Sequence, residues 1–245
     1  MSLEESLRSC TMKIVKFSVV CSLIFSGVAP LLISCSPQGK NADAKPEMTL
    51  QQRNDSLVME CLVCHSNQEA QRGPVLNGMD NWYLIDQLEK FRSGVRGQRL
   101  SNRSEYLMGI GAKKIKNDYE LAYLAKWFAD QTPQPAVRTV RGNLVEGKKL
   151  YDQRCASCHG EKGEGNRLAG GPSLNRLEGW YYLEQMRKFR SGERGYHSMD
   201  ITGRTMAAAA NGISDYNLKS IVAYSVNAFG PEEEISKREQ YSPKN

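Results

Sequence analysis

Histidine, strand-like patterning and a long apolar run are all scarce or missing in this sequence. The 245 residues include only three histidines, so few imidazoles are available as ligands or as acid/base groups. Strand signals are absent, which indicates a helical chain. The formal net charge is +6, but no Lys/Arg-dense helix or aromatic-basic motif accompanies it, and nucleic-acid binding is not indicated. The main apolar run, residues 17–33, is short for a membrane-spanning helix.

Two short motifs contain four of the seven cysteines and two of the three histidines. The first is CLVCH at residues 61–65, and the second is CASCH at residues 155–159. This spacing is the attachment pattern for a c-type haem, because positions i, i+3 and i+4 share one face of a helix and can hold one porphyrin and its iron. The motifs predict two covalently attached haem c groups, with Cys61, Cys64, Cys155 and Cys158 as attachment sites and His65 and His159 as axial ligands.

The two halves of the chain repeat each other around these motifs. When Gly73 is aligned with Gly171, 14 of the 25 positions from residue 73 to residue 97 are identical at a fixed offset of 98. The motifs themselves are offset by 94, so the second half has four extra residues in a glycine-rich loop within 160–170. The sequence therefore indicates a tandem duplication.

The repeat also selects a second axial ligand for each iron, and methionine in that position suits electron transfer. Met108 matches Met206 at the offset of 98, and the two lie 43 and 47 residues after the motif histidines. A single methionine is more often core filler, but two at equivalent places favour Met108 and Met206 as ligands. Met199 and His197 are the alternatives in the second half, and neither has a matching residue of its own type in the first half.

Apolar periodicity and stop signals predict the same three helices in each half. One helix leads into each motif, a second ends at a Ser-Gly step, and a third follows an Asp-containing cap. The expected ranges are 50–61, 83–92 and 119–130 in the first half, and 145–155, 181–190 and 216–229 in the second half.

The first 46 residues have the composition of an export leader and a tether. Two lysines precede the apolar run, and LISC at 32–35 resembles the bacterial lipoprotein box. Lipidation at Cys35 is therefore predicted, with ordinary cleavage nearby or an uncleaved anchor as the alternatives. Either Met1 or Met12 is compatible with the start of this leader.

The motifs, the repeated Gly-Pro-x-Leu and Phe-Arg-Ser-Gly-x-Arg stretches and the placed methionines resemble the class I cytochrome c fold. The duplication is similar to that of the periplasmic dihaem cytochromes of the c-four type, and the resemblance covers nearly all of residues 47–229. It implies an all-α chain of two tandem class I cytochrome c domains, each wrapped around one haem, with the haems close across a pseudo-twofold interface. Ser66 departs from the family's usual His-Gly step, which Gly160 retains.

The resemblance and the leader together divide the chain into six expected segments. These are a signal peptide at 1–34, a lipidated N-terminus and flexible tether at 35–46, cytochrome c domain 1 at 47–130, a linker at 131–141, cytochrome c domain 2 at 142–229 and a tail at 230–245.

The resemblance also suggests roles for residues around the haems. In this family a backbone carbonyl near a proline such as Pro74 or Pro172 accepts a hydrogen bond from the histidine, while a plain turn proline is the alternative. The repeated Trp-Tyr pairs and arginines can donate hydrogen bonds to haem propionates. Solvated surface is the alternative for Arg96 and Arg194.

The predicted function is electron transfer, without bond chemistry on a substrate. The expected protein is a membrane-anchored periplasmic carrier with two His/Met haems. Its donor would be a quinol-oxidising complex or dehydrogenase, and its acceptor a terminal oxidase or reductase. The alternatives are an electron-transfer subunit of such a complex, a dihaem peroxidase, for which only His197 is left over, and a four-cysteine zinc module, which leaves the motif histidines unexplained.

Overall fold

The computed structural model describes residues 47–66, 73–134 and 138–230. Within these ranges the chain is helical, with no strand and only an isolated bridge between Asn166 and Gly171, and the all-α prediction is confirmed. None of the helices there combines the length and apolar character needed to cross a bilayer. The leader with Cys35, the tether, the loop residues 67–72 and the tail from residue 231 lie outside the described ranges.

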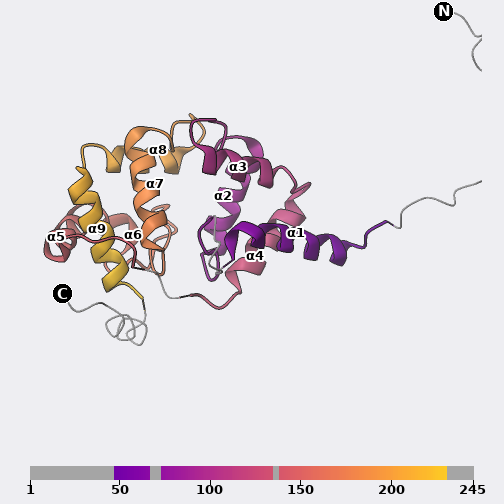
Figure 1. Cartoon of the computed structure of the whole chain (residues 1–245), viewed down its shortest axis with the longest axis horizontal. Helices are drawn as coiled ribbons and strands as arrows, with labels where there is room; N and C mark the ends of the chain where they lie inside the picture. The colour runs from indigo at the N-terminus through magenta and orange to yellow at the C-terminus, as the bar shows by residue number, and fades with distance from the viewer. Residues whose placement is uncertain (1–46, 67–72, 135–137, 231–245) are drawn as a thin grey trace, which may run out of the picture. The chain divides into compact units, whose positions relative to one another are not determined.

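The described part of the first half contains four helices (Figure 1). They are α1 (Leu50–His65), α2 (Asn81–Ser93), α3 (Arg103–Ala112) and α4 (Asp118–Ala129). A capping box between Thr49 and Gln52 starts α1, and the side chains of Asn102 and Asn117 cap α3 and α4. α2 ends at Gly94, whose φ of 83° lies in the left-handed region that glycine adopts without strain.

The second half repeats this order with one additional short helix. Its helices are α5 (Leu144–Arg154), α6 (Ala156–His159), α7 (Gly179–Ser191), α8 (Ile201–Ala210) and α9 (Asp215–Ala228). Asn143, Asp200 and Ser214 accept backbone hydrogen bonds at the starts of α5, α8 and α9. The backbone at Cys155 (φ −120°, ψ −39°) separates α5 from α6, whereas α1 continues unbroken through the first motif.

All six predicted helices are present, and their ends lie within four residues of the expected positions. The sequence does not predict α3 and α8, which carry Met108 and Met206. Glycines in both helices weaken the local helix propensity. The side-chain caps at Asn102 and Asp200 compensate by satisfying backbone N–H groups at the start of each helix.

Each half has a hydrophobic core of its own. The first core contains Leu57, Leu88 and Phe128, and the second contains Tyr151 and Met186, among other residues. Met186 is 4% exposed and matches Leu88 at the offset of 98, as expected for a core position rather than a ligand. Burying a side chain of this size stabilises the fold by about 1.5–3 kcal/mol.

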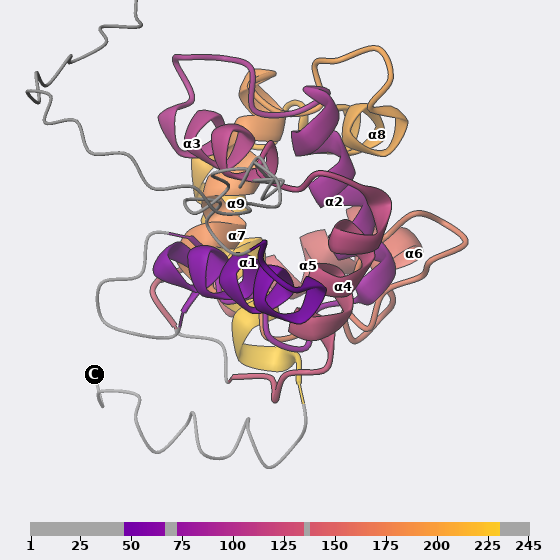
Figure 2. The same cartoon turned by 90° about the vertical axis from the view of Figure 1, so that its right-hand side faces the viewer.

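The crossing of the first and last helices differs between the halves. α5 meets α9 at Gly147, where a Cβ atom would overlap the carbonyl oxygen of Ser220. The matching residue at the offset of 94 is Arg53 on α1, which lies beside α4 (Figure 2). Its Nε lies 3.1 Å from Glu120 Oε1, so an ion pair replaces the close helix contact of the second half.

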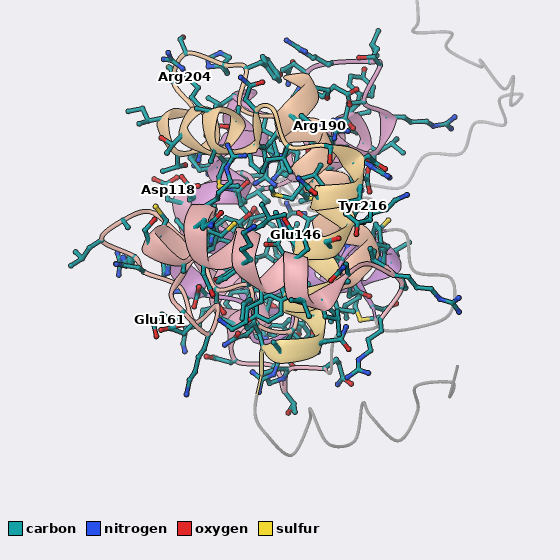
Figure 3. The ribbon with its side chains drawn as sticks, turned by 90° about the vertical axis from the view of Figure 1, so that its left-hand side faces the viewer. Asp118, Glu146, Glu161, Arg190, Arg204 and Tyr216 are labelled. Carbon is teal, nitrogen blue, oxygen red and sulfur yellow. The ribbon has the colours of Figure 1, made fainter. Side chains whose placement is uncertain are left out.

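Charged groups also join α7 to the start of α9. Arg187 Nη2 lies 2.7 Å from Asp215 Oδ2, and Arg190, labelled in Figure 3, donates to the carbonyl of Ile213 at 2.9 Å. The hydrogen bond from Arg187 holds the pKa of the Asp215 carboxyl below its usual range.

Gly147→Ala is expected to lower the free energy of unfolding by about 1–3 kcal/mol, because the added methyl group pushes α5 away from α9. Gly111→Ala is the matched control, since a Cβ atom there meets nothing within 4 Å, and it is expected to raise stability by about 0.5–1 kcal/mol. Urea unfolding followed by circular dichroism measures both. Equal effects of the two substitutions would contradict the close crossing.

Candidate haem-binding sites

A cavity of about 370 Å³ is lined mainly by the second half and in part by the first half. Cys155, Cys158 and His159 of the motif line it together with Met206 of α8 and Phe189 of α7. Its walls are mostly apolar, which suits a flat hydrophobic macrocycle with a few polar groups at its edge.

Both motif histidines are buried and hydrogen-bonded to a proline carbonyl. Nδ1 of His65 lies 2.8 Å from the carbonyl oxygen of Pro74, and Nδ1 of His159 lies 2.8 Å from that of Pro172. Because a carbonyl can only accept, Nδ1 carries the proton and Nε2 keeps its lone pair. This is the tautomer that an iron ligand requires, and the expected proline contact is confirmed in both halves.

Burial sets the protonation of the motif residues. It lowers the pKa of His65 and His159, although the hydrogen bond to proline acts in the opposite direction. Burial also raises the pKa of the Cys61 and Cys155 thiols to about 11. All four motif cysteines are free of disulfides, so their sulfur atoms are available for thioether bonds.

Glycine stands before each of these prolines because a side chain has no room there. A Cβ atom on Gly73 would lie 2.6 Å from Cε1 of His65, and one on Gly171 would overlap the carbonyl of Cys158. The repeated Gly-Pro step therefore brings the loop against the motif and supplies the carbonyl that orients the histidine.

The methionines and His197 occupy distinct places. Met206 lines the cavity with His159, and Met108 lies half-buried against the first core. Met199 is 65% exposed, and its backbone N–H donates a hydrogen bond to Nδ1 of His197 at 3.2 Å. Neither Met199 nor His197 belongs to the cavity lining, whereas Met206 does, together with Met186 of α7 and Met79 of the first half.

A cluster of two glutamines and two arginines lies at the boundary of the halves. Arg96 donates to Oε1 of Gln87 at 2.6 Å and to Oε1 of Gln185 at 2.9 Å. Arg194 donates to the same two oxygens, at 2.9 Å each. Gln87 matches Gln185 and Arg96 matches Arg194 at the offset of 98. This Gln/Arg cluster therefore looks the same from either half, as a pseudo-twofold axis between the halves requires.

Arg96 and Arg194 are only 4% and 5% exposed, so the solvated-surface alternative is wrong for both. Their guanidinium groups lie 4.5 and 4.4 Å from the ring centroids of Phe91 and Phe189. Hydropathy places arginine at the surface. The sequence feature that could have indicated buried arginines is the Gln-x8-Arg spacing, which is identical in both halves.

Lysine contacts across the boundary follow the same symmetry. Lys90 donates to Oγ1 of Thr202 at 2.8 Å, and Lys188 donates to Oγ of Ser104 at 2.8 Å. Each lysine belongs to one half and each hydroxyl to the other, and both pairs match at the offset of 98.

The residues that precede α2 and α7 also act across the boundary. Asp80 and Glu178 make no side-chain cap bond to their own helices. Instead, Asp80 accepts from the backbone N–H of Ser173 at 3.0 Å, and Glu178 accepts from that of Val75 at 2.9 Å. Sequence reasoning missed these two carboxylates, since an acidic residue before a helix is typically a cap.

The chain leaves the two motifs in different directions. Gly160 has φ 81° and ψ 156°, a conformation that is strained for any other residue. Ser66 at the matching place has φ −78° and ψ 160°, which any residue adopts. Serine in place of the glycine that usually follows the motif histidine therefore goes with a different backbone conformation at that position.

The second motif fits a covalently attached haem. It combines two unpaired thiols, a histidine with a free Nε2 and a thioether in one apolar cavity. Buried Arg194 also lines this cavity and offers positive charge for carboxylates. The first motif has the same kinds of donor in matching positions.

Comparison with known proteins gives the same family. A model of the cytochrome c family matches residues 144–227. Cytochrome c4 of Azotobacter vinelandii is 29% identical over 175 residues, covering 67% of this chain and 82% of the relative. Cytochrome c-554(547) of Halothiobacillus neapolitanus is 31% identical over 87 residues, covering 34% of this chain and 93% of the relative.

Two further matches extend over both halves. The thiosulfate dehydrogenase electron acceptor of Stutzerimonas stutzeri is 27% identical over 217 residues, covering 82% of this chain and 93% of that protein. The crystal structure of reduced cytochrome c4 from Pseudomonas stutzeri has the same fold, with a TM-score of 0.57 and 24% identity over 75% of this chain and all of that one.

The repeated motifs, the two helical halves and these matches agree with one another. Haem c attached through cysteine thioethers is the cofactor that the family implies, and the motif cysteines are placed to bind it. The chain belongs to the cytochrome c family, as an electron-transfer cytochrome whose two helical halves have the tandem class I fold and resemble cytochrome c4.

Proposed function

We propose that this cytochrome is a membrane-anchored electron carrier with two haem c groups, on the periplasmic side of a bacterial membrane. The observation that carries the proposal is the cavity in which one motif and a methionine from a separate helix line the same space. The proposed attachment sites are Cys61, Cys64, Cys155 and Cys158, and the proposed axial ligands are His65, Met108, His159 and Met206.

When bound, haem c supplies a one-electron Fe(III)/Fe(II) couple. The residues of the chain hold and tune it. The carbonyls of Pro74 and Pro172 fix the orientation of the histidine rings and make Nε2 a better donor. A thioether from methionine favours the reduced iron and raises the potential. Neither role requires a bond to a substrate.

The boundary between the halves supports electron exchange between two sites. Tyr83, Gln87 and Lys90 of the first half line the cavity of the second half. Arg96 and Arg194 supply buried guanidinium donors for haem carboxylates. A fixed, hydrogen-bonded boundary of this kind keeps two centres in one relative position without a conformational step.

The domain limits that we propose are 47–130 and 142–229, joined by a linker at 131–141. Their support is that each hydrophobic core draws residues from one half alone. α4 ends at Ala129 and α5 begins at Leu144, which leaves the segment between them as the connection.

Export and anchoring rest on the leader, which lies outside the described residues. The proposal assigns a signal peptide to residues 1–34, lipidation to Cys35 and a flexible tether to the segment up to residue 46. Residues 230–245 are proposed as a tail. A lipidated N-terminus would keep the carrier at the membrane surface, near complexes that exchange electrons with it.

The proposed partners are a quinol-oxidising complex or dehydrogenase as donor and a terminal oxidase or reductase as acceptor. The second candidate function is an electron-accepting subunit of a dehydrogenase, and the match to a thiosulfate dehydrogenase electron acceptor favours it. Stable co-purification with a large catalytic partner would support the subunit role. A freely isolated protein that reduces an oxidase would support the carrier role.

A spectroelectrochemical titration tests the two-haem proposal. The purified protein is expected to show two one-electron steps at positive potentials, because methionine ligation favours Fe(II). One strongly negative haem that binds external ligands would contradict the carrier role and favour an enzyme such as a peroxidase.

Met206→Ala is expected to remove the contribution of the second haem to the far-red absorption band of methionine-ligated haem. The intensity of that band should fall by roughly half if both haems are His/Met-ligated. Met199→Ala is the matched control because that side chain is exposed and outside the cavity. Absorption spectra of the oxidised proteins measure both. An unchanged spectrum for Met206→Ala, or an equal loss for Met199→Ala, would refute the assignment.

Cys35→Ser is expected to release the protein from the membrane fraction into the soluble periplasmic fraction, because the proposed lipid attachment is lost. Cys21 lies in the apolar run of the leader, and Cys21→Ser should leave membrane association unchanged. Fractionation with haem staining and intact mass measures the result. A Cys35→Ser protein that stays in the membrane fraction would exclude this anchor.

A further inference from the structure

The two arginines of the Gln/Arg cluster have unequal counter-ions. Arg96 Nη2 lies 2.5 Å from Glu105 Oε1, and both side chains are buried. Among the described residues no carboxylate lies within ion-pair distance of Arg194, and its hydrogen-bond acceptors belong to Gln87, Gln185 and Tyr83, which are neutral. The guanidinium of the first half is therefore in a direct ion pair, whereas Arg194 interacts with Glu105 only at longer range.

The difference arises from a single position in the repeat. Glu105 matches Gly203 at the offset of 98, so the second half has no side chain with which to reach Arg194. A Cβ atom on Gly203 would overlap the carboxylate of Asp200. The space that a side chain at residue 203 would need is thus already taken by another acid.

Asp200 does not replace Glu105 in function. Its Oδ1 lies 2.9 Å from Nζ of Lys90 in the first half and accepts a hydrogen bond from the backbone of Gly203 at 3.0 Å. Its match in the first half is Asn102, which is neutral. Each half contributes one buried acid at the start of its methionine-bearing helix, but only Glu105 neutralises an arginine.

The positions of these groups relate them to the two sites. Arg194 lines the second cavity together with His159 and Met206, and Arg96 is its match in the first half at the offset of 98. Glu105 lies on α3, one helical turn before Met108. Burial favours the neutral carboxyl, yet the charge of Arg96 holds the pKa of Glu105 below its usual range, so the side chain is an anion at neutral pH.

We propose that Glu105 lowers the reduction potential of the first haem relative to the second and so directs the electron of the half-reduced protein to the second haem. This inference rests on the proposed two-haem function. A buried negative charge stabilises Fe(III) over Fe(II), because the oxidised iron carries one more positive charge and a low-dielectric interior screens the interaction little. Glu105 acts through Arg96 as a positioning and charge-balancing residue.

Glu105→Gln tests this proposal, because glutamine keeps the size and an oxygen acceptor for Arg96 but removes the charge. The midpoint of the first haem is expected to rise by more than that of the second, because Glu105 pairs directly with Arg96 and only at longer range with Arg194. The electron distribution of the half-reduced protein should move about tenfold toward the first haem, which equals about 59 mV for a one-electron couple. Spectroelectrochemical titration measures the midpoints, and NMR of the haem methyl groups assigns each midpoint to its haem.

Glu120→Gln is the matched control. Glu120 is a second buried glutamate of the first half, and it pairs with Arg53 rather than with the Gln/Arg cluster. Its substitution should leave the difference between the midpoints unchanged. Glu105→Asp retains the charge and should leave the difference close to that of the natural protein, which a purely structural role for Glu105 does not predict.

The outcomes separate the two proposals. Equal movement of both midpoints, no movement, or an equal effect of Glu120→Gln would overturn the role of Glu105. If Glu105→Gln fails to incorporate haem, Glu105→Met removes the charge at similar volume and the same criteria apply. A natural protein with a single redox-active haem would overturn the proposed function itself.

Discussion

Two buried guanidinium groups impose the constraint on which the arrangement of the halves depends. A buried charge is costly unless hydrogen bonds replace its lost hydration, and Arg96 and Arg194 obtain most of those bonds at the boundary between the halves. Each glutamine oxygen of the cluster accepts from one arginine of its own half and one of the other. A shift of either half would therefore break hydrogen bonds to both charges at once, so the boundary specifies one relative position.

Within each half, the geometry of the motif depends on the Gly-Pro step that follows it. The glycine admits the loop to the histidine, and the proline carbonyl then selects the imidazole tautomer with a free Nε2. The glycine and the proline of this step thus determine both the path of the chain and the orientation of the histidine beside the motif. This linkage explains why the step recurs in both halves while the loops around it differ in length.

The repeat made the fold predictable, and it also sets Met108 and Met206 apart from the other methionines, because only these two hold matching positions in the two halves. Local signals were weaker. α3 and α8 contain glycines and lack strong periodicity, so only their side-chain caps, seen in the structure, explain where they begin. The burial of Arg96 could not be predicted from hydropathy, since it depends on acceptors that lie up to 89 residues away in the chain.

The ion pair between Arg96 and Glu105 has a further consequence for how the chain is made. During synthesis the first half emerges before the second. Arg96 already has Glu105 and Gln87 within its own half, so its charge is satisfied before any later residue arrives. Arg194 emerges when Tyr83 and Gln87 are already in place to receive it. Arg96 therefore has partners without the second half, whereas Arg194 depends in part on groups that the first half supplies.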